Sequence, residues 1–241
     1  MEGQFLELKD YILIKPTVRR KVITTNDGSS TLYMEDLGET YHSIHGAIQE
    51  ANHVYILNGL ERLSKKSIQI LEIGFGTGLN FYLTYLYALE NNIQLQYVGL
   101  EAYPLEEKEW EQINYQHLLP KSTVSLDDIH KLSWGEEHHI INNIQLIKIH
   151  NTVQDFTIAQ TFDLIYFDAF GYDYQPELWS KMILEKMFHA LNPGGILVTY
   201  ACKGIVNRTL KEIGFEVEKH QGPPGKREMT VAYKVNKSVR L

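Results

Sequence analysis

The sequence is poor in several features that define whole classes of protein. A single cysteine, Cys202, among 241 residues permits no internal disulfide and fits a reducing compartment. No apolar run approaches the roughly 18 residues that a membrane helix needs. Residues 1–10 contain acids and lack the basic-then-apolar order of a secretion signal, so we expect a cytoplasmic protein with no membrane partner.

Basic residues are also in the minority. Lys and Arg number 23 against 30 Asp and Glu, and the formal net charge of −7 disfavours broad, non-specific binding to nucleic acid. The bases are clustered, however, with four in residues 15–21 and nine in residues 203–240. On one side of a fold the two clusters would form a local phosphate-binding surface, although either could be an ordinary solvated face.

Strand-like and helix-like runs alternate along most of the chain. Residues 1–40 look β-rich, residues 45–63 have helical spacing, and the remaining pattern predicts strands at 68–73, 94–101, 144–149, 162–168, 195–201, 215–219 and 229–235, with helices at 78–90, 105–118, 176–191 and 204–213. This alternation indicates an α/β fold with a doubly wound, mostly parallel seven-stranded sheet. We expect residues 1–63 to form a β-rich and helical extension packed on a core of residues 64–241.

Residues 70–80 (ILEIGFGTGLN) join a short apolar run to a glycine-rich turn and then to an aromatic-rich helix. Glycine has no side chain and tolerates positive φ, so the backbone at Gly74, Gly76 and Gly78 can approach a ligand closely. Glu72 disfavours a dinucleotide, because a carboxylate would repel the pyrophosphate that such a turn binds. It suits S-adenosylmethionine (SAM), which carries an ammonium, a sulfonium and a ribose. An ordinary βα turn without a ligand is the alternative.

Two further acids follow predicted strands. Glu101 lies 23 residues beyond Gly78, close to the ~20-residue offset at which nucleotide-binding α/β units place a carboxylate on the ribose. Paired with the glycine turn, it is better explained as a ligand residue than as a solvated acid. Asp155 follows the strand 144–149 after a short loop and suits a hydrogen bond to an adenine amino group, but a solvated helix-start aspartate fits equally well.

The apolar run 164–167 ends in Asp168, which aromatic residues follow. We expect Asp168 to face the same crevice as the glycine turn, where its carboxylate can accept a hydrogen bond from an amine and help remove the amine's proton during methylation. A cap on the following turn is the simpler role. Phe170, Tyr172 and Tyr174 can stack on a planar base or form the edge of a hydrophobic lid.

A basic loop, residues 222–229 (GPPGKREM), separates the last two predicted strands. Two prolines restrict the loop, so Lys226 and Arg227 are presented with little entropy to lose, either to a ligand or to solvent. Three histidines at 130–139 lack the spacing that fixes three or four metal ligands, and we expect no metal. No serine elbow or Cys/His pair suggests covalent catalysis.

These features resemble the methyltransferase domain of the bifunctional tRNA-modifying protein MnmC and its stand-alone relatives, often called MnmD. The similarity runs through most of the chain. The motifs that carry it are GFGTGLNF at 74–81, Glu101 with YPL at 103–105, YFDAF at 166–170, PELW at 176–179, PGG at 193–195, GETYHS at 38–43 and, most specific of all, KEIGFEVEKHQGPPGKREM at 211–229. We do not expect the flavin-dependent oxidative half of the bifunctional protein here.

The resemblance implies a Rossmann-like, class I SAM-dependent methyltransferase. Its substrate would be the 5-aminomethyl group of wobble (2-thio)uridine in tRNA, and its product 5-methylaminomethyl-2-thiouridine. Asp168 is the expected acid–base group. The residues expected to bind SAM are Glu72, Gly74, Phe75, Gly76, Gly78, Asn80, Glu101 and Asp155. Those expected to contact the anticodon loop of tRNA are Tyr172, Tyr174, Lys203, Lys226 and Arg227. We favour a monomer.

Two other kinds of function stay open at this point. One is different chemistry on the same sheet, either a small-molecule methyltransferase or a spermidine-synthase-like aminopropyltransferase. The latter would need a second carboxylate near Asp168, for which Asp173 is the near candidate. The other is a module that binds SAM or RNA without turnover. The presence of Glu72, Glu101 and Asp168 together disfavours a non-catalytic module.

Overall fold

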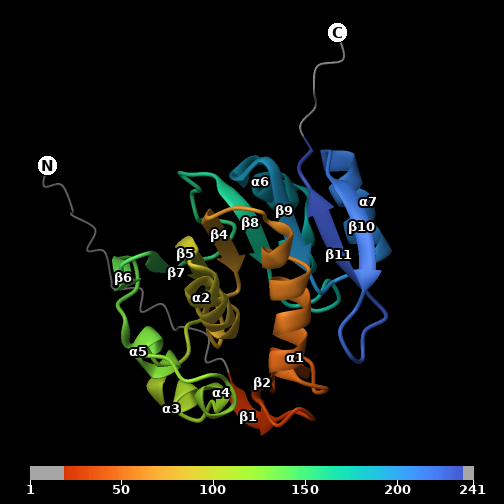
Figure 1. Cartoon of the computed structure of the whole chain (residues 1–241). Helices are drawn as coiled ribbons and strands as arrows, with labels where there is room; N and C mark the ends of the chain where they lie inside the picture. The colour runs from red at the N-terminus through yellow and green to blue at the C-terminus, as the bar shows by residue number, and fades with distance from the viewer. Residues whose placement is uncertain (1–18, 236–241) are drawn as a thin grey trace, which may run out of the picture.

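A twisted sheet with helices on both faces forms the centre of the molecule (Figure 1). The structure, a computed structural model, describes residues 19–235. Within that range the sheet has eight strands in the order β10-β11-β9-β8-β4-β5-β7-β6. Their bounds are β4 (Ser67–Ile73), β5 (Gln94–Glu101), β6 (Glu137–Ile141), β7 (Ile144–His150), β8 (Phe162–Phe167), β9 (Leu191–Thr199), β10 (Glu216–Gln221) and β11 (Glu228–Tyr233).

The inner strands of this sheet are parallel and the outer ones antiparallel. β4 pairs in parallel with β5 and β8, β5 with β7, and β8 with β9. β11 runs antiparallel to β9 and β10, as β6 does to β7. The near-continuous burial of β4, β5 and β8 suits strands that are covered on both faces. Because β5 lies on one side of β4 and β8 on the other, the winding of the sheet reverses between β4 and β8.

Two hydrophobic clusters fill the space between the sheet and its helices. One face is covered by α1 (Ala47–Ala51), the π-helical η1 (Asn52–Leu57) and α2 (Leu79–Asn91), and its cluster includes Tyr55 and Tyr97. The other face is covered by α6 (Lys181–Ala190) and α7 (Gly204–Ile213), whose cluster includes Phe167. Figure 1 shows α1 and α2 in front of the sheet and α6 behind it.

A smaller sheet and several short helices lie at the bottom of Figure 1. The small sheet contains β1 (Arg20–Thr24), β2 (Ser30–Met34) and β3 (Glu39–Thr40), all antiparallel. The helices are α3 (Glu107–Trp110), α4 (Tyr115–Leu118) and α5 (Leu126–Lys131). Arg20 joins the two groups, because its guanidinium donates to Glu109 Oε2 at 3.0 Å and to the Tyr103 carbonyl oxygen at 2.6 Å.

The sequence predicts the α/β class and every strand of the large sheet except the edge strand β6, and it is wrong mainly about helices. The range 45–63 is α1, then η1, then the 3-10 turn η2 (Leu60–Arg62). The range 105–118 holds two short helices, α3 and α4, and 176–191 holds the 3-10 turn η3 (Pro176–Trp179) before α6. β9 begins at Leu191, four residues before the predicted start. The β-prone run 11–14 and the base at position 15 lie outside the described residues.

Local backbone geometry explains where the predicted helices break. Ser180 is extended, with φ −64° and ψ 153°, and therefore separates η3 from α6. Gly59 leaves the helical region at φ −116° and ψ −81°, which separates η1 from η2.

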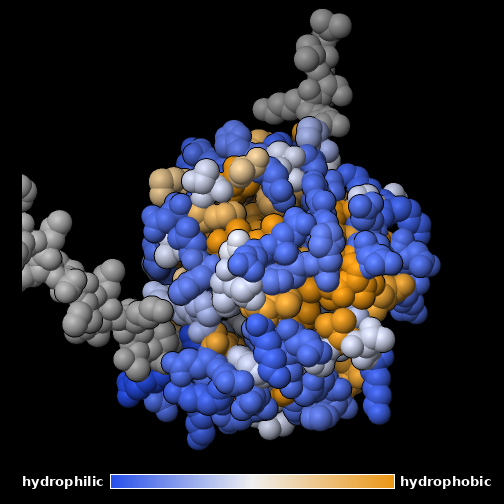
Figure 2. All heavy atoms as spheres, turned by 90° about the vertical axis from the view of Figure 1, so that its left-hand side faces the viewer, coloured by the Kyte–Doolittle hydropathy of each residue, from blue (hydrophilic) through white to orange (hydrophobic). Residues whose placement is uncertain are grey.

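Strand β6 adds one strand to the sheet, at an edge that the sequence does not predict. Figure 2 shows the side of the molecule that carries this edge: hydrophilic residues cover most of it, and apolar ones appear in recesses between them.

Candidate active site

A cavity of about 380 Å³ opens at the carboxyl ends of β4, β5 and β8. Its volume is in the range of small-molecule sites, and it lies where the winding of the sheet reverses. The glycine turn after β4, Glu101 at the end of β5 and Asp168 after β8 all line it. Segments outside these strands complete the wall with Met34, Leu37, Tyr41, His42, Leu178 and Tyr200.

The glycine turn has the left-handed backbone that its sequence predicts. Gly74, Gly76 and Gly78 have φ values of +90°, +50° and +72°. A Cβ atom on Gly74 would lie 2.5 Å from the Asp168 carbonyl oxygen, so no other residue fits there without a backbone shift. Phe75 also lines the cavity, but its ring packs edge-on against Trp134 in the core. The turn thus presents backbone to the cavity, as a closely approaching ligand requires.

Glu101 is held in a fixed orientation at the cavity wall. Its Oε2 accepts a hydrogen bond from the Gly76 N–H at 2.8 Å, and its Oε1 accepts one from the Tyr103 N–H at 2.9 Å. Each carboxylate oxygen can accept a further hydrogen bond. The side chain is therefore preorganised to receive a pair of neighbouring hydroxyl groups, such as those of a ribose.

Asp168 follows β8 directly and lines the cavity. Its N–H donates to the Ile73 carbonyl oxygen at 2.9 Å, and its Oδ2 accepts from Asn80 Nδ2 at 2.8 Å. Burial raises the pKa of this carboxyl to about 7, although the Tyr55 hydroxyl, the Asn80 amide and the charge of Lys226 oppose the rise. The group therefore changes protonation near neutral pH, which suits a proton acceptor for an amine.

Glu72 is fully buried and lies outside the cavity wall, so the structure does not bring this predicted SAM residue to the cavity. Side chains alternate along a strand, and the one at position 72 shares the face of β4 that α2 covers. Its Oε1 accepts from Asn80 Nδ2 and its Oε2 from the Tyr97 hydroxyl, both at 2.8 Å. Burial raises the pKa of Glu72 well above the usual value for a carboxyl. Glu72 therefore anchors Asn80, which bridges the two acids Glu72 and Asp168.

Asp155 also lies outside the cavity. Its carboxylate accepts a hydrogen bond from the Thr152 hydroxyl at 2.8 Å, and its N–H donates to the same oxygen at 3.2 Å. The exposed side chain thus closes a turn of its own loop, and the structure does not place it where the predicted contact with an adenine would be made. Residues 151–154, immediately before it, do line the cavity.

The aromatic segment after β8 divides between the cavity and the surface. Phe170 lines the cavity, and its ring meets that of Tyr41 edge-on at a centroid distance of 5.3 Å. Tyr172 is half-buried and Tyr174 is 42% exposed, and neither belongs to the cavity wall. Phe170 and Tyr41 are therefore the aromatic pair inside the site, and the two following tyrosines lie outside it.

Lys203 lies in the same surface region. Its ammonium is 5.5 Å from the centroid of the Tyr172 ring, and it forms an ion pair with Asp173. A cation over an aromatic face is attracted by the ring's quadrupole. The structure thus brings two of the predicted tRNA contacts, Lys203 and Tyr172, together beside the cavity.

The two bases of the loop between β10 and β11 are presented differently. Lys226 forms an ion pair with the buried carboxylate of Glu50 in α1, and its ammonium is 4.2 Å from the centroid of the Tyr200 ring. Arg227 is exposed. Lys226 is therefore turned toward the protein, and Arg227 is left free to meet a large ligand at the surface.

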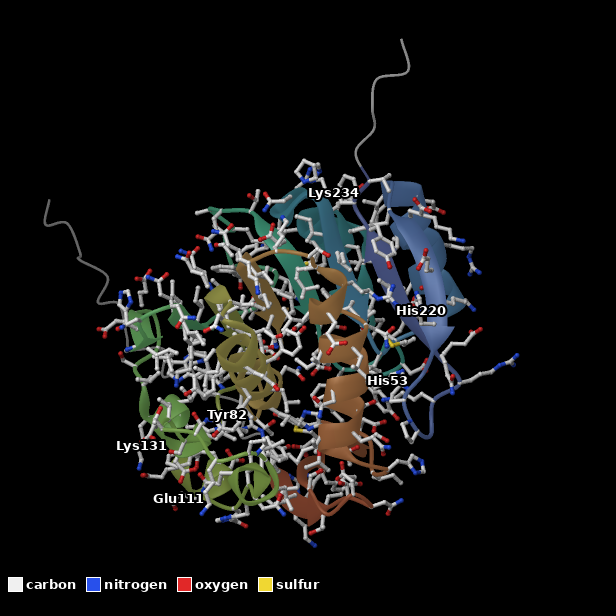
Figure 3. All side chains as sticks on the ribbon, viewed as in Figure 1. His53, Tyr82, Glu111, Lys131, His220 and Lys234 are labelled. Carbon is white, nitrogen blue, oxygen red and sulfur yellow. The ribbon has the colours of Figure 1, made fainter. Side chains whose placement is uncertain are left out.

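Three contacts join this loop to the segment of α1 and η1. Figure 3 labels one of the residues, His53, which points from η1 toward the loop. Its Nε2 donates to the Gln221 carbonyl oxygen at 2.8 Å. We call the set the clasp: the ion pair Glu50–Lys226, the hydrogen bond His53–Gln221, and the His45 ring against Gly225, where a Cβ atom would lie 2.0 Å from the ring.

Sequence reasoning assigned no role to Tyr41 or Tyr200, which both line the cavity. Tyr200 directly follows β9, and its hydroxyl donates to the Ala169 carbonyl oxygen at 2.9 Å. Its position after a strand end is the signal that identifies it. Tyr41 lies just beyond β3 of the small sheet and gives no comparable signal.

Across residues 19–235, no group of three or more His, Cys, Asp or Glu side chains could hold a metal ion. Over the same residues, no helix combines the length and the apolar character needed to cross a bilayer.

Residues 105–235 match the model of a family described as S-adenosyl-L-methionine-dependent methyltransferases. The chain belongs to this family, and its cofactor is SAM. The cavity fits that cofactor, because an open glycine turn lies beside Glu101, whose two oxygens suit the ribose hydroxyls. The predicted class I methyltransferase fold is confirmed.

Individual curated relatives give a more specific similarity than the family model does. The tRNA 5-methylaminomethyl-2-thiouridine biosynthesis bifunctional protein MnmC of Cupriavidus necator is 30% identical over 216 residues, which are 83% of this chain and 32% of the relative. MnmC of Cupriavidus metallidurans is 30% identical over 228 residues, 87% of this chain and 33% of the relative. The chain spans about a third of the length of these relatives. The resemblance to the MnmC family seen in the motifs is thereby confirmed.

Solved structures agree with this placement. MNMC2 from Aquifex aeolicus has a TM-score of 0.72 and 25% sequence identity, and the match covers 91% of this chain and 72% of that one. Spermidine synthase from Thermotoga maritima has a TM-score of 0.50 at 13% identity, covering 90% of this chain and 74% of that one. The second likeness concerns the fold alone.

Proposed function

We propose that this methyltransferase N-methylates the 5-aminomethyl group of wobble (2-thio)uridine in tRNA, giving 5-methylaminomethyl-2-thiouridine. One observation carries the proposal: a carboxylate with a pKa near 7, Asp168, lines the SAM cavity next to the glycine turn. The names of the MnmC relatives refer to the biosynthesis of the same product. We place the reaction in the cytoplasm, where tRNA is available.

Asp168 performs the proton transfer in this proposal. The acceptor amine must be neutral to react, and the ionised carboxylate both orients it and takes the proton that the nitrogen loses when its new bond forms. Bound SAM supplies an electrophilic methyl group, whose bond to sulfur breaks as the bond to nitrogen forms. No covalent enzyme intermediate is needed. Holding the reactants in contact contributes up to ~7–11 kcal/mol in favourable cases.

The two sides of the cavity would bind different molecules. Gly74, Gly76, Gly78 and Glu101 would hold SAM. Residues 151–154, which line the cavity, would contact its adenine in place of Asp155. The wobble base, unstacked from its loop, would enter beside the paired rings of Tyr41 and Phe170 on the other wall.

Outside the cavity, the exposed groups beside it suit the rest of the anticodon loop. Tyr172 and Tyr174 offer stacking surfaces, and Lys203 and Arg227 offer cations for phosphates. These few cations would give the acidic protein a local rather than a general affinity for RNA.

The structure disfavours an aminopropyltransferase. A polyamine would require a free second carboxylate near Asp168, but Asp173 is paired with Lys203, and the buried Glu50 is paired with Lys226. Both acids already have cationic partners, so neither is available to hold a second ammonium group.

Methyl-labelled SAM and undermodified tRNA provide the direct test. We expect label in tRNA and, by mass analysis of its nucleosides, one added methyl on the 5-aminomethyl uridine. Decarboxylated SAM with putrescine serves as the parallel reaction and should give no product. Label absent from tRNA but present in a small-molecule acceptor would overturn the proposal, as would transfer of an aminopropyl group.

A further inference from the structure

Behind the catalytic carboxylate lies a chain of buried polar groups. The Tyr97 hydroxyl donates to Glu72, Asn80 Nδ2 donates to Glu72 and to Asp168, and all three hydrogen bonds measure 2.8 Å. Tyr97, Glu72 and Asn80 are each at most 2% exposed. A single amide nitrogen thus holds two acids that would otherwise repel each other, and it ties Asp168 to α2.

A second buried polar side chain, Tyr55 of η1, influences Asp168. Tyr55 belongs to the π-helical η1, is 1% exposed, and packs against the Tyr166 ring at a centroid distance of 5.0 Å. Within residues 19–235 its hydroxyl makes no close hydrogen bond. Burial raises the pKa of this phenol, and the Asp168 carboxylate is the charge that adds most to the rise. Two carboxylates, those of Asp168 and Glu50, act on this hydroxyl, and Asp168 does so more strongly. Because Glu50 is paired with Lys226, Asp168 is the acceptor left to Tyr55.

We propose that Asn80 and Tyr55 are positioning residues that hold Asp168 from inside the protein, leaving the carboxylate to face the acceptor amine. The proposal rests on the proposed function, in which Asp168 receives the amine's proton. Asn80 also lines the cavity, so this role is compatible with the SAM contact that the sequence predicts. The proposal also assigns a function to η1, which agrees with the frequent occurrence of π-helical turns at functional sites.

The charged groups around Asp168 influence its ionisation less than Tyr55 and Asn80 do. The ionisable and polar groups that face it are Tyr55, Asn80, Tyr200, Glu50 and Lys226, with Glu72 behind Asn80. Glu50 and Lys226 form an ion pair, so their effects on the carboxylate largely cancel. The Tyr200 hydroxyl donates to the Ala169 carbonyl oxygen instead. Among residues 19–235, Asn80 and Tyr55 are then the two side chains that most favour the ionised form of Asp168.

The first test needs neither SAM nor tRNA. The carboxyl carbon of Asp168, labelled with carbon-13 and assigned by comparison with Asp168→Asn, is titrated by NMR in the full chain. Tyr55→Phe and Asn80→Leu each remove donors while keeping the side-chain shape, so each should raise the midpoint by about one pKa unit. Tyr85→Phe is the matched control, because this buried tyrosine of α2 donates to or accepts from Ser122 at 2.6 Å, away from the site. Its midpoint should equal the wild-type value.

The second test is the pH dependence of methyl transfer to tRNA. A rise of one unit from a midpoint near 7 should slow Tyr55→Phe about fivefold at neutral pH and leave the rate nearly normal two units higher. A loss of packing alone would lower the rate by the same factor at every pH. Recovery at alkaline pH therefore distinguishes positioning from damage.

Failure of this inference is separable from failure of the proposed function. Unchanged NMR midpoints in both folded variants would overturn the role of Tyr55 and Asn80, whether or not tRNA is methylated. Raised midpoints would support it even if tRNA proved to be the wrong substrate. Thermal unfolding of each variant establishes that the protein titrated is folded, and Tyr55→Phe suffices if Asn80→Leu unfolds.

Discussion

The two sides of the cavity are built in opposite ways. The donor side, where we propose that SAM binds, consists of the glycine turn after β4 and Glu101 at the end of β5, two neighbouring strands joined by one helix. The acceptor side includes Tyr41, Asp168 and Tyr200 in the cavity wall. Tyr55 and the clasp lie behind them, and the whole set comes from segments spread over most of the chain. The donor side depends on local backbone geometry, and the acceptor side depends on long-range packing.

This difference separates two kinds of vulnerability. Changes on the donor side should weaken one ligand and leave the rest of the molecule intact. Changes on the acceptor side should alter catalysis and stability together, because the same contacts hold the site and join distant segments. The following variants test that division.

The largest effect is expected on the acceptor side. Asp168→Ala removes the group that receives the amine's proton, so methyl transfer should fall by at least ~10²-fold, the lower range for a positioned general base. SAM affinity, measured by calorimetry, should be largely retained because Glu101 and the glycine turn are untouched. Near-normal turnover would contradict the assignment of Asp168.

Glu101→Ala should produce the next largest effect, on the donor side. Loss of a charged acceptor for two hydroxyls should weaken SAM binding by roughly 10- to 100-fold. Asp155→Ala is the matched control, since that carboxylate only closes its own loop, and its SAM affinity should stay within about twofold of wild type. Equal losses in the two variants would show that Asp155 reaches the cofactor after all.

A third variant measures how much the buried carboxylate of Asp168 destabilises the folded protein. The folded pKa of Asp168 is about 7 and that of an unfolded aspartate about 3.9, so the folded state binds more protons between these values and stability falls as pH rises through them. Asp168→Asn cannot ionise. Above neutral pH it should be more stable than wild type, on the order of 2 kcal/mol. Below about pH 4 the gain should vanish. Urea unfolding above neutral pH and below about pH 4 measures this gain in stability. A gain that does not depend on pH would rule out the ionisation of Asp168 as its cause.

The smallest effects separate the two bases of the loop between β10 and β11. Lys226→Ala leaves the buried Glu50 without its partner, so it should destabilise the protein by about 1–2 kcal/mol. Arg227→Ala should change stability by less than about 0.5 kcal/mol but reduce the slope of log K for tRNA against log salt by about 1. A reversed pattern would mean that Lys226, not Arg227, contacts the RNA.

The sequence predicts the strands of the fold well because buried strands leave an unambiguous signal. Runs such as 68–73 and 94–101 are apolar on both faces and bounded by polar residues, and β4 and β5 match them within a residue. Strand β6 is missed because its side chains are mostly polar at an edge, although Asn142-Asn143 between two β-prone runs is a hairpin signal. The helices at 45–63 and 105–118 break because extended or irregular residues interrupt an apolar pattern that continues past them.

The sequence also locates some residues of the candidate site better than others, for similar reasons. Glu101 and Asp168 are correctly placed at the cavity, because a residue at a strand end of a parallel sheet has a defined location. Glu72 is misplaced by one residue of strand alternation, which turns its side chain beneath α2. Tyr55 and the pairing of Lys226 with Glu50 depend on contacts between segments far apart in the chain, and no local pattern encodes them.

The clasp also sets an order of assembly during protein synthesis. Glu50 and His53 leave the ribosome early, whereas their partners in the loop between β10 and β11 are 176 and 168 residues further along the chain. The glycine turn and Glu101 can pack as soon as β4 and β5 have emerged, because both strands and the helix between them are then complete. A nascent chain should therefore acquire a place for the methyl donor well before it can close the wall around the acceptor, so that catalytic competence comes only with the last hairpin.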